Sequence, residues 1–198
     1  MSQLAMGQKA GVELVKSAPS DRINARGRFK VEHWRNGKRI NEYQFPNGIV
    51  NQGKNELLNV MFHSTAAITS WFVGLLDSIS YTALAATDDY QDINQVANGW
   101  KEFTAYTDNL NGGNATTRPA WAVGAASAQS VTNAAPSVFD ITSAGTVKGL
   151  FLVGGISAAQ TKNDHAANGI LWATALFTSG DVTVAAGDQL KVTYTVSA

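Results

Sequence analysis

The residues that could do acid–base or metal chemistry are few and scattered along the chain. The three histidines, His33, His63 and His165, lie far apart, and no two of them have the spacing of metal ligands. The chain has no cysteine, so it offers no disulfide, no thiol nucleophile and no zinc site of the cysteine type. We therefore expect structural roles for the histidines, and we predict no catalytic residue, no cofactor and no metal site.

The acidic cluster of Asp88, Asp89 and Asp92 could bind a hard cation through carboxylate oxygens. It lacks the glycine and the distal glutamate of an EF-hand loop, which favours a solvated loop instead. The glycine pairs at 112–113 and 154–155 are not in a strand–loop–helix followed by Lys-Ser or Lys-Thr, so neither predicts a phosphate site. No Gly-x-Ser-x-Gly elbow of a hydrolase occurs. These patterns predict a protein that is not an enzyme.

Five tryptophans are many for a chain of 198 residues, and they raise the possibility of carbohydrate binding. Trp71 and Trp172 lie inside apolar runs, and we expect both in the core. Trp34, Trp100 and Trp121 have polar neighbours and could line a surface. For these three, burial in the core or in a subunit interface is the alternative to a sugar-binding platform.

The composition indicates one domain with little charge. Fifteen basic and fifteen acidic residues give a formal net charge of +0 and a pI near 6.8. Charged residues make up only 15% of the chain, below the usual quarter. Such a chain either hides much of its surface against neighbours or has a neutral Ser/Thr/Asn surface. We expect no nucleic-acid partner, because the overall charge is balanced, although the basic residues are concentrated between Arg22 and Arg39. We expect no membrane partner, because no signal peptide or long apolar run is present.

The strongest local signal is a hairpin at 28–45, with Asn36-Gly37 supplying the two positive φ angles of a type I′ turn. Counting outward from this turn predicts four cross-strand pairs on one face: Trp34 with Arg39, Glu32 with Asn41, Lys30 with Tyr43, and Arg28 with Phe45. Three of the four place a cation beside an aromatic ring. The other face has Phe29, Val31 and Ile40, and we predict that it faces the core.

One short helix is predicted at about 51–63, with Asn51 as the N-cap. Its apolar positions have helical spacing and form one stripe, which we expect to cap an opening of the β-domain: Leu57, Leu58, Met61 and Phe62. The apolar run 71–76 predicts a strand that is buried on both faces. Strand patterns return at 100–106, 137–142, 146–153, 169–177 and, with a break, 182–196. We therefore predict a mainly β protein, an antiparallel β-sandwich or jelly-roll-like domain over 27–198, preceded by an extended N-terminal arm at 1–26.

The order of these elements resembles small structural proteins of tailed bacteriophages. The segments that carry the resemblance are PNGIVNQGKNELLNVMF, WFVGLLD, Arg118-Pro119-Ala120-Trp121, SVTN, VFDIT, TVKGLFLVGG, GILWATALF and VAAGDQLKVTYTV. They cover the chain from Gly27 to its C-terminus and contain no site chemistry. The resemblance implies a virion component, either a capsid decoration (cement) protein or a tail-associated or fibre protein, and usually a homotrimer.

We expect a decoration protein, located in the virion after assembly in the bacterial host cytoplasm. Its partners would be further copies of itself and the major capsid protein. The predicted contacts lie on the arm and the hairpin: Arg22, Arg26, Arg28, Lys30, Trp34, Arg39 and Tyr43. The arm is either a frayed tail or a segment that crosses to a neighbouring subunit. The alternative function is receptor or glycan binding at the tail tip or fibre, through the loops 108–117 and 157–168 with Trp100 or Trp121.

Overall fold

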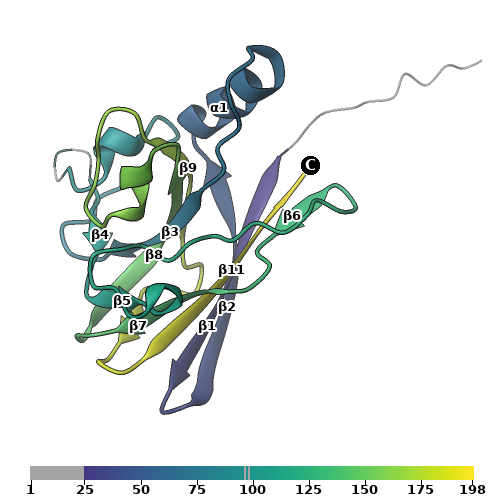
Figure 1. The fold of residues 1–198 in the computed structure, drawn as a ribbon. Coiled ribbons are helices and arrows are strands. Elements are labelled where there is room, and N and C mark those ends of the chain that lie inside the picture. The colour runs from purple at the N-terminus through teal and green to yellow at the C-terminus, as the bar shows by residue number, and fades with distance from the viewer. Residues whose placement is uncertain (1–24, 96, 98) are drawn as a thin grey trace, which may run out of the picture.

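The computed structural model describes residues 25–95, 97 and 99–198, which form a curled antiparallel sheet with one α-helix at its rim (Figure 1). The predicted arm therefore lies outside the described residues up to Asn24. The first strand begins at Arg26, within the range that we assigned to the arm.

The helix is α1 (Asn51–Phe62). The strands are β1 (Arg26–Arg35), β2 (Lys38–Ile49), β3 (Trp71–Asp77), β4 (Glu102–Phe103), β5 (Tyr106–Asp108), β6 (Ser130–Thr132), β7 (Ser137–Ile141), β8 (Gly145–Gly154), β9 (Ile170–Leu176), β10 (Val182–Val184) and β11 (Gln189–Ser197). Short 3-10 turns are η1 (Tyr90–Asp92), η3 (Asn109–Asn111) and η4 (Ser157–Gln160).

The strands follow the order β4-β3-β8-β9-β2-β1-β11-β7-β5, with β10 beside β8 and β6 beside β11. β2 joins the two halves of the sheet, because it pairs with β1 up to Asn47 and then with β9 through Gly48 and Ile49. The sheet curls around this long strand into a half-barrel (Figure 1). The mainly β class with one short helix is confirmed, and the sandwich or jelly roll stays a prediction.

The hairpin forms as predicted at its turn, where Asn36 and Gly37 have φ angles of 50° and 72°. Trp34 lies opposite Arg39, but the register shifts between His33 and Trp34. Beyond that irregularity the predicted pairs are wrong: Glu32 lies opposite Glu42, Lys30 opposite Gln44 and Arg28 opposite Pro46. A shift of one residue moves side chains to the other face of a strand, so it changes which residues share a surface.

The core has two parts, separated by β3 and β8. Val73 and Leu75 belong to the large cluster inside the half-barrel, while Phe72 and Leu76 belong to a smaller cluster on the outer side. β3 is thus buried on both faces, as its sequence predicts. Phe29, Val31 and Phe45 are also fully or almost fully buried, whereas Ile40, which we predicted for the core face, is half exposed near the hairpin tip.

α1 begins and ends where the sequence predicts, but its environment differs. Val50, and not Asn51, occupies the N-cap position, with no side-chain cap. The predicted capping of the β-domain by the apolar stripe is wrong, because Leu58, Met61 and Phe62 are 53%, 54% and 75% exposed. The helix projects from the rim of the half-barrel (Figure 1).

Candidate interaction surfaces

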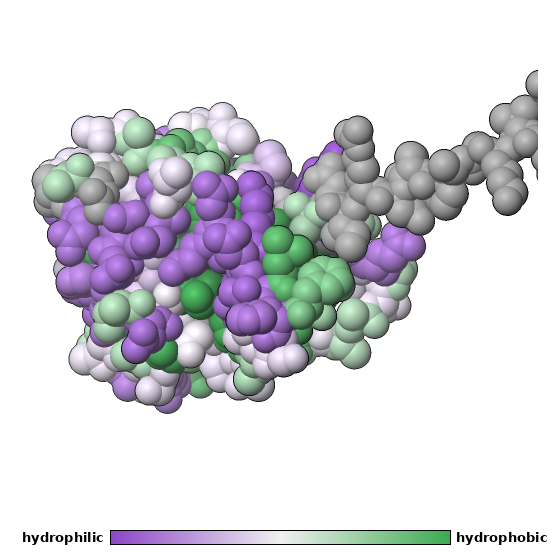
Figure 2. All heavy atoms as spheres, turned by 90° about the horizontal axis from the view of Figure 1, so that it is seen from above, coloured by the Kyte–Doolittle hydropathy of each residue, from purple (hydrophilic) through white to green (hydrophobic). Residues whose placement is uncertain are grey.

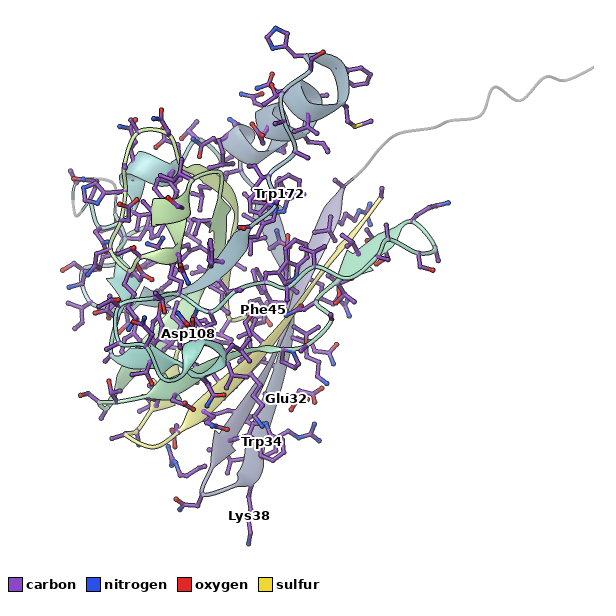
Figure 3. The ribbon with its side chains drawn as sticks, viewed as in Figure 1. Glu32, Trp34, Lys38, Phe45, Asp108 and Trp172 are labelled. Carbon is purple, nitrogen blue, oxygen red and sulfur yellow. The ribbon has the colours of Figure 1, made fainter. Side chains whose placement is uncertain are left out.

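The predicted contact residues of the hairpin lie on β1 and β2, apart from Arg22, which is outside the described residues. Arg26 and Arg28 are exposed and Lys30 and Trp34 half-buried, so four of them follow the outward-facing positions of β1. Arg39 is exposed near the turn. Figure 3 shows Glu32, Trp34 and Lys38 at the end of the molecule opposite α1.

Tyr43 does not join this surface, because the register shift places it opposite Val31, which faces the core. Residues directly opposite each other on paired strands share a face of the sheet. The Tyr43 ring accordingly packs against Phe177, with 5.1 Å between ring centroids. The prediction of Tyr43 beside the hairpin cations is therefore wrong.

Two of the hairpin cations, Lys30 and Arg39, form ion pairs with acids of the same hairpin. Lys30 Nζ lies 3.0 Å from Glu32 and 3.4 Å from Glu42, and Arg39 Nη1 lies 2.7 Å from Glu42. The hydrogen bond to Glu32 raises the pKa of Lys30, and the same bond lowers the pKa of Glu32. Trp34 donates its indole N–H to Glu32 across 3.0 Å. Lys30 and Arg39 therefore form an ion-pair network with Glu32 and Glu42, while the hairpin as a whole keeps more basic than acidic residues.

A buried carboxylate fixes the far end of β1. Asp188 accepts hydrogen bonds from Arg35 Nε and Nη2, each at 2.7 Å, and its Oδ2 lies 2.7 Å from Nε2 of buried His33. The bond from Arg35 holds the pKa of Asp188 well below its ordinary range. The hydrogen-bonded structural role predicted for His33 is confirmed, and the cluster ties β1 to the turn before β11.

A second buried pair holds the outer core together. Arg118 is fully buried, and its Nε and Nη2 lie 2.9 Å and 2.8 Å from the two carboxylate oxygens of Glu102. The Glu102 carboxylate also accepts from the hydroxyl of Tyr106 at 3.0 Å and from the backbone N–H of Asn163 at 2.7 Å. Nη1 of Arg118 donates to the carbonyl of Ala159 at 2.8 Å. Every strong donor and acceptor of this group has an internal partner, so its arrangement serves the fold.

The acidic cluster is also structural, although the predicted solvated loop is wrong for Asp88. This carboxylate is buried and accepts from the Trp100 indole and from the Ala85 backbone, each at 3.0 Å. Asp89 and Asp92 form a capping box around η1. Within the described ranges, no group of three or more His, Asp or Glu side chains could hold a metal ion.

For Trp100 and Trp121 the core alternative is confirmed, whereas Trp71 and Trp172, which we expected in the core, are less buried than predicted. Trp100 and Trp121 are 1% and 6% exposed, and both indole N–H groups bind internal acceptors. Trp71 and Trp172 are only half-buried, and their rings meet edge to face with centroids 5.9 Å apart. The apolar pattern around these two residues comes from neighbours on the strand and did not reveal their open side.

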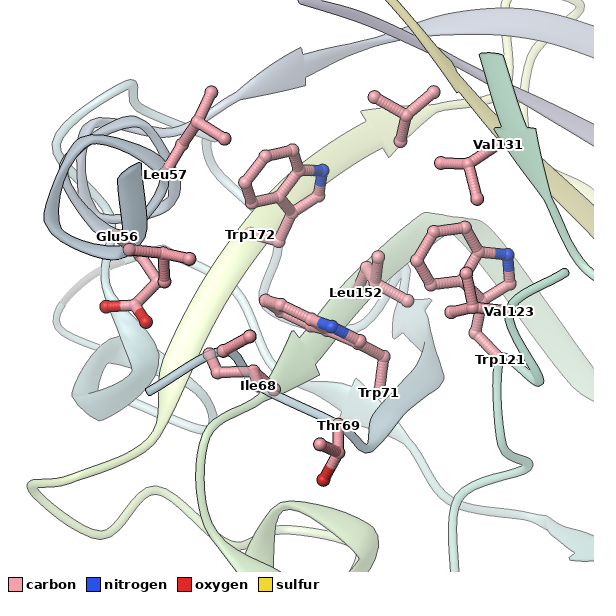
Figure 4. Close-up of a pocket in the computed structure, with 13 residues that line it drawn as sticks. Glu56, Leu57, Ile68, Thr69, Trp71, Trp121, Val123, Val131, Leu152 and Trp172 are labelled. Atoms are coloured by element: carbon pink, nitrogen blue, oxygen red, sulfur yellow. The ribbon is translucent and has the colours of Figure 1, made fainter. Parts of the chain in front are cut away.

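Trp71 and Trp172 line a groove of about 380 Å³ between α1 and the mouth of the half-barrel, called here the tryptophan groove. Figure 4 shows Trp71 and Trp172 close together on one side and Trp121 on the other, with Leu57 and Glu56 entering from α1. Apart from Glu56 and Thr69, the side chains that line the groove are apolar or aromatic. The full lining is Glu56, Leu57, Val60, Ala67, Ile68, Thr69, Trp71, Trp121, Val123, Val131, Leu152, Trp172 and Val196. Glu56 is its one charged residue among the described side chains.

A second, smaller groove of about 250 Å³ lies on the other side of Leu57 and Trp172, which line both. This outer groove is lined by Ala25, Ile49, Lys54, Leu57, Leu58, Met61, Phe62 and Trp172. Figure 2 looks down on this end of the molecule and shows hydrophobic side chains gathered at the surface beside polar ones. Together the two grooves and the exposed face of α1 make an apolar end that no other part of the described chain covers.

Comparisons with known proteins add no assignment to this geometry. Over the chain positions that the structure describes, no helix is long and apolar enough to cross a membrane. Neither a scan against models of protein families nor a search of curated proteins found a match to this chain.

Proposed function

We propose that this chain is a structural protein of a tailed-phage virion, a capsid decoration (cement) protein. It binds the outer capsid surface as a homo-oligomer, a trimer, and stabilises contacts between major capsid subunits. The observation that carries the proposal is the apolar end formed by α1 and the two grooves. An uncovered apolar surface of this kind marks a site of protein–protein contact.

The distribution of charge supports a structural role. The buried acids Glu102 and Asp188 are each held by an arginine of the same chain, so these charges serve contacts within the fold. The resemblance in element order to phage virion proteins points the same way. We also propose that the domain is of the sandwich or jelly-roll type, with which the curled half-barrel is compatible.

The two ends of the molecule suit two kinds of contact. α1 and the tryptophan groove lie at one end, and the hairpin turn at Asn36-Gly37 lies at the other (Figures 1 and 3). In the proposal the apolar end binds neighbouring copies, because strongly apolar contacts are typical of lasting subunit interfaces. The charged hairpin, with Arg28, Lys30, Trp34 and Arg39, faces the capsid, where paired charges give specificity.

No surface of the described residues supports the alternative, glycan or receptor binding at a tail tip, in the way that the apolar end supports a structural role. It was based on Trp100 or Trp121 as a sugar platform, and both side chains are buried with their indole N–H groups bound internally. The loops 108–117 and 157–168 keep no exposed tryptophan, because the chain has none in either range.

Copy number and particle binding test the proposal. The purified protein is added to phage particles that lack it, and bound copies are counted by gel densitometry and located by cryo-electron microscopy. A regular array on the head with a high copy number is the expected result. A handful of copies at the tail, or no binding, contradicts a decoration role. Arg28→Glu on the hairpin should weaken particle binding, whereas Lys101→Glu, away from the hairpin, should leave it unchanged.

A further inference from the structure

α1 is anchored firmly at its first turn. The Gln52 side-chain oxygen accepts hydrogen bonds from the backbone N–H groups of Tyr90 and Leu171, at 3.0 Å and 2.7 Å. Gly53 packs so closely on β9 that an added Cβ would lie 2.5 Å from the Trp172 carbonyl oxygen. The first turn is therefore part of the rigid body, and the direction in which the helix projects is set by the fold.

The remaining turns of α1 carry more apolar surface than the described chain covers. Lys54, Leu58 and Met61 follow one another at intervals of four and three residues, which places them on one side of the helix with Phe62 beside them. All four side chains are exposed. A helix normally buries its apolar stripe against another element. This side of α1, called here the helix ridge, therefore has the character of a surface that is covered in the working form of the protein.

The tryptophan groove beside the ridge is the matching concave surface. It is apolar, open and floored by Trp71, Trp172 and Leu152 (Figure 4). Its charged lining residue is Glu56, while the charged residue of the ridge is Lys54. Neither of these two forms an ion pair with another side chain in the described part of the molecule. Residues two apart on a helix do not face each other, so the two charges do not pair within one chain.

We propose that the helix ridge of a second copy of this chain fills the tryptophan groove, with Lys54 of one copy beside Glu56 of the next. The ridge and the groove are different surfaces, so the contact is head-to-tail and closes into a ring when the rotation between copies allows it. The charges select a second copy over other apolar occupants, because one chain supplies both the cation and its acceptor. The inference rests on the proposed function, which requires a homo-oligomer, and it names the surface that builds it.

Sedimentation equilibrium over a concentration series tests this contact on the full chain. We expect the wild type to form a closed oligomer. Phe62→Ser should raise the concentration at half-assembly about thirtyfold or more, as loss of an interface aromatic does. Its matched control is Ile79→Ser, which removes an apolar side chain that is 62% exposed away from the ridge and should change nothing. Circular dichroism and thermal unfolding check that each variant is folded.

A charge exchange tests the identity of the occupant. Lys54→Glu and Glu56→Lys should each weaken assembly about tenfold, because each brings like charges together. The double variant restores an opposite pair between copies and should assemble to within about threefold of the wild type. A monomeric wild type, an oligomer that Phe62→Ser leaves intact, or a double variant no better than the singles overturns the proposal.

Two further experiments distinguish a second copy from residues 1–24 as the occupant of the groove, and the ridge contact from the decoration role. If deleting residues 1–24 reduces assembly as much as Phe62→Ser does, then that segment occupies the groove and the inference is wrong. Assembly that survives the deletion supports it. An oligomer built through the ridge that does not bind phage particles refutes the decoration role while leaving the contact in place. If instead the oligomer binds particles but its assembly is unaffected by Phe62→Ser, the ridge contact is refuted and the decoration role is kept.

Discussion

Replacing Glu102 with glutamine tests how much the buried ion pair contributes to the fold. Glutamine keeps the size of the side chain but removes the charge that faces Arg118, and its NH2 group would point at donors, among them the N–H of Asn163. Removing one partner of a buried pair costs about 3–5 kcal/mol. Since a chain of this length loses about 2–4 °C of melting temperature per kcal/mol, Tm should fall by roughly 6–20 °C.

Calorimetry and urea denaturation measure this loss, and Asp181→Asn supplies the control. Asp181 lies 2.8 Å from Lys148 Nζ, so the geometry resembles the buried pair, but both side chains are partly exposed. A surface pair contributes at most about 1 kcal/mol. Equal losses in the two variants, or a Glu102→Gln loss below about 1 kcal/mol, would refute the reasoning that burial makes the unpaired charge of Arg118 costly.

Three further expectations follow from the fold. Gly53→Ala should lower the free energy of unfolding by about 1–3 kcal/mol, because the methyl group meets the backbone of β9, and urea titration measures it. The pKa of Asp188 is lower in the folded chain than its ordinary value of 3.8, so the unfolded chain takes up the proton first. The stability that the ionised Asp188 provides is therefore complete above about pH 4–5 and is lost as the pH falls further. Asp188→Asn should flatten the dependence of the urea midpoint on pH between 3 and 6. An unchanged slope contradicts this. Deleting residues 1–24 should weaken particle binding and leave Tm unchanged, as pull-down and calorimetry will show.

Local chemistry explains what could be predicted of the fold. Asn36-Gly37 makes a hairpin turn from two residues, and the apolar run at 71–76 makes a strand buried on both faces. The hairpin register was missed because its irregularity adjoins His33, whose partner Asp188 is 155 residues away in sequence. No local pattern contains that contact.

The candidate surface was predicted only in part for a similar reason. Helical spacing identifies the apolar side of α1, but it does not say whether this chain or another molecule covers it. The fates of Trp100 and Trp121 depend on Asp88 and Asn133, which accept their N–H groups and let an indole with polar neighbours be buried. A polar neighbourhood in the sequence therefore does not distinguish a surface tryptophan from a core tryptophan with a hydrogen-bond partner.

The two outermost strands of the sheet have a consequence for how copies can associate. β4 has two residues and β5 three, so each edge offers few free backbone groups to an incoming strand. Each also carries a buried carboxylate, Glu102 in β4 and Asp108 in β5. Short edges with inward charges oppose strand addition, the route by which β-proteins polymerise into fibrils. At β4 and β5 the fold therefore opposes the growth of fibrils by strand addition.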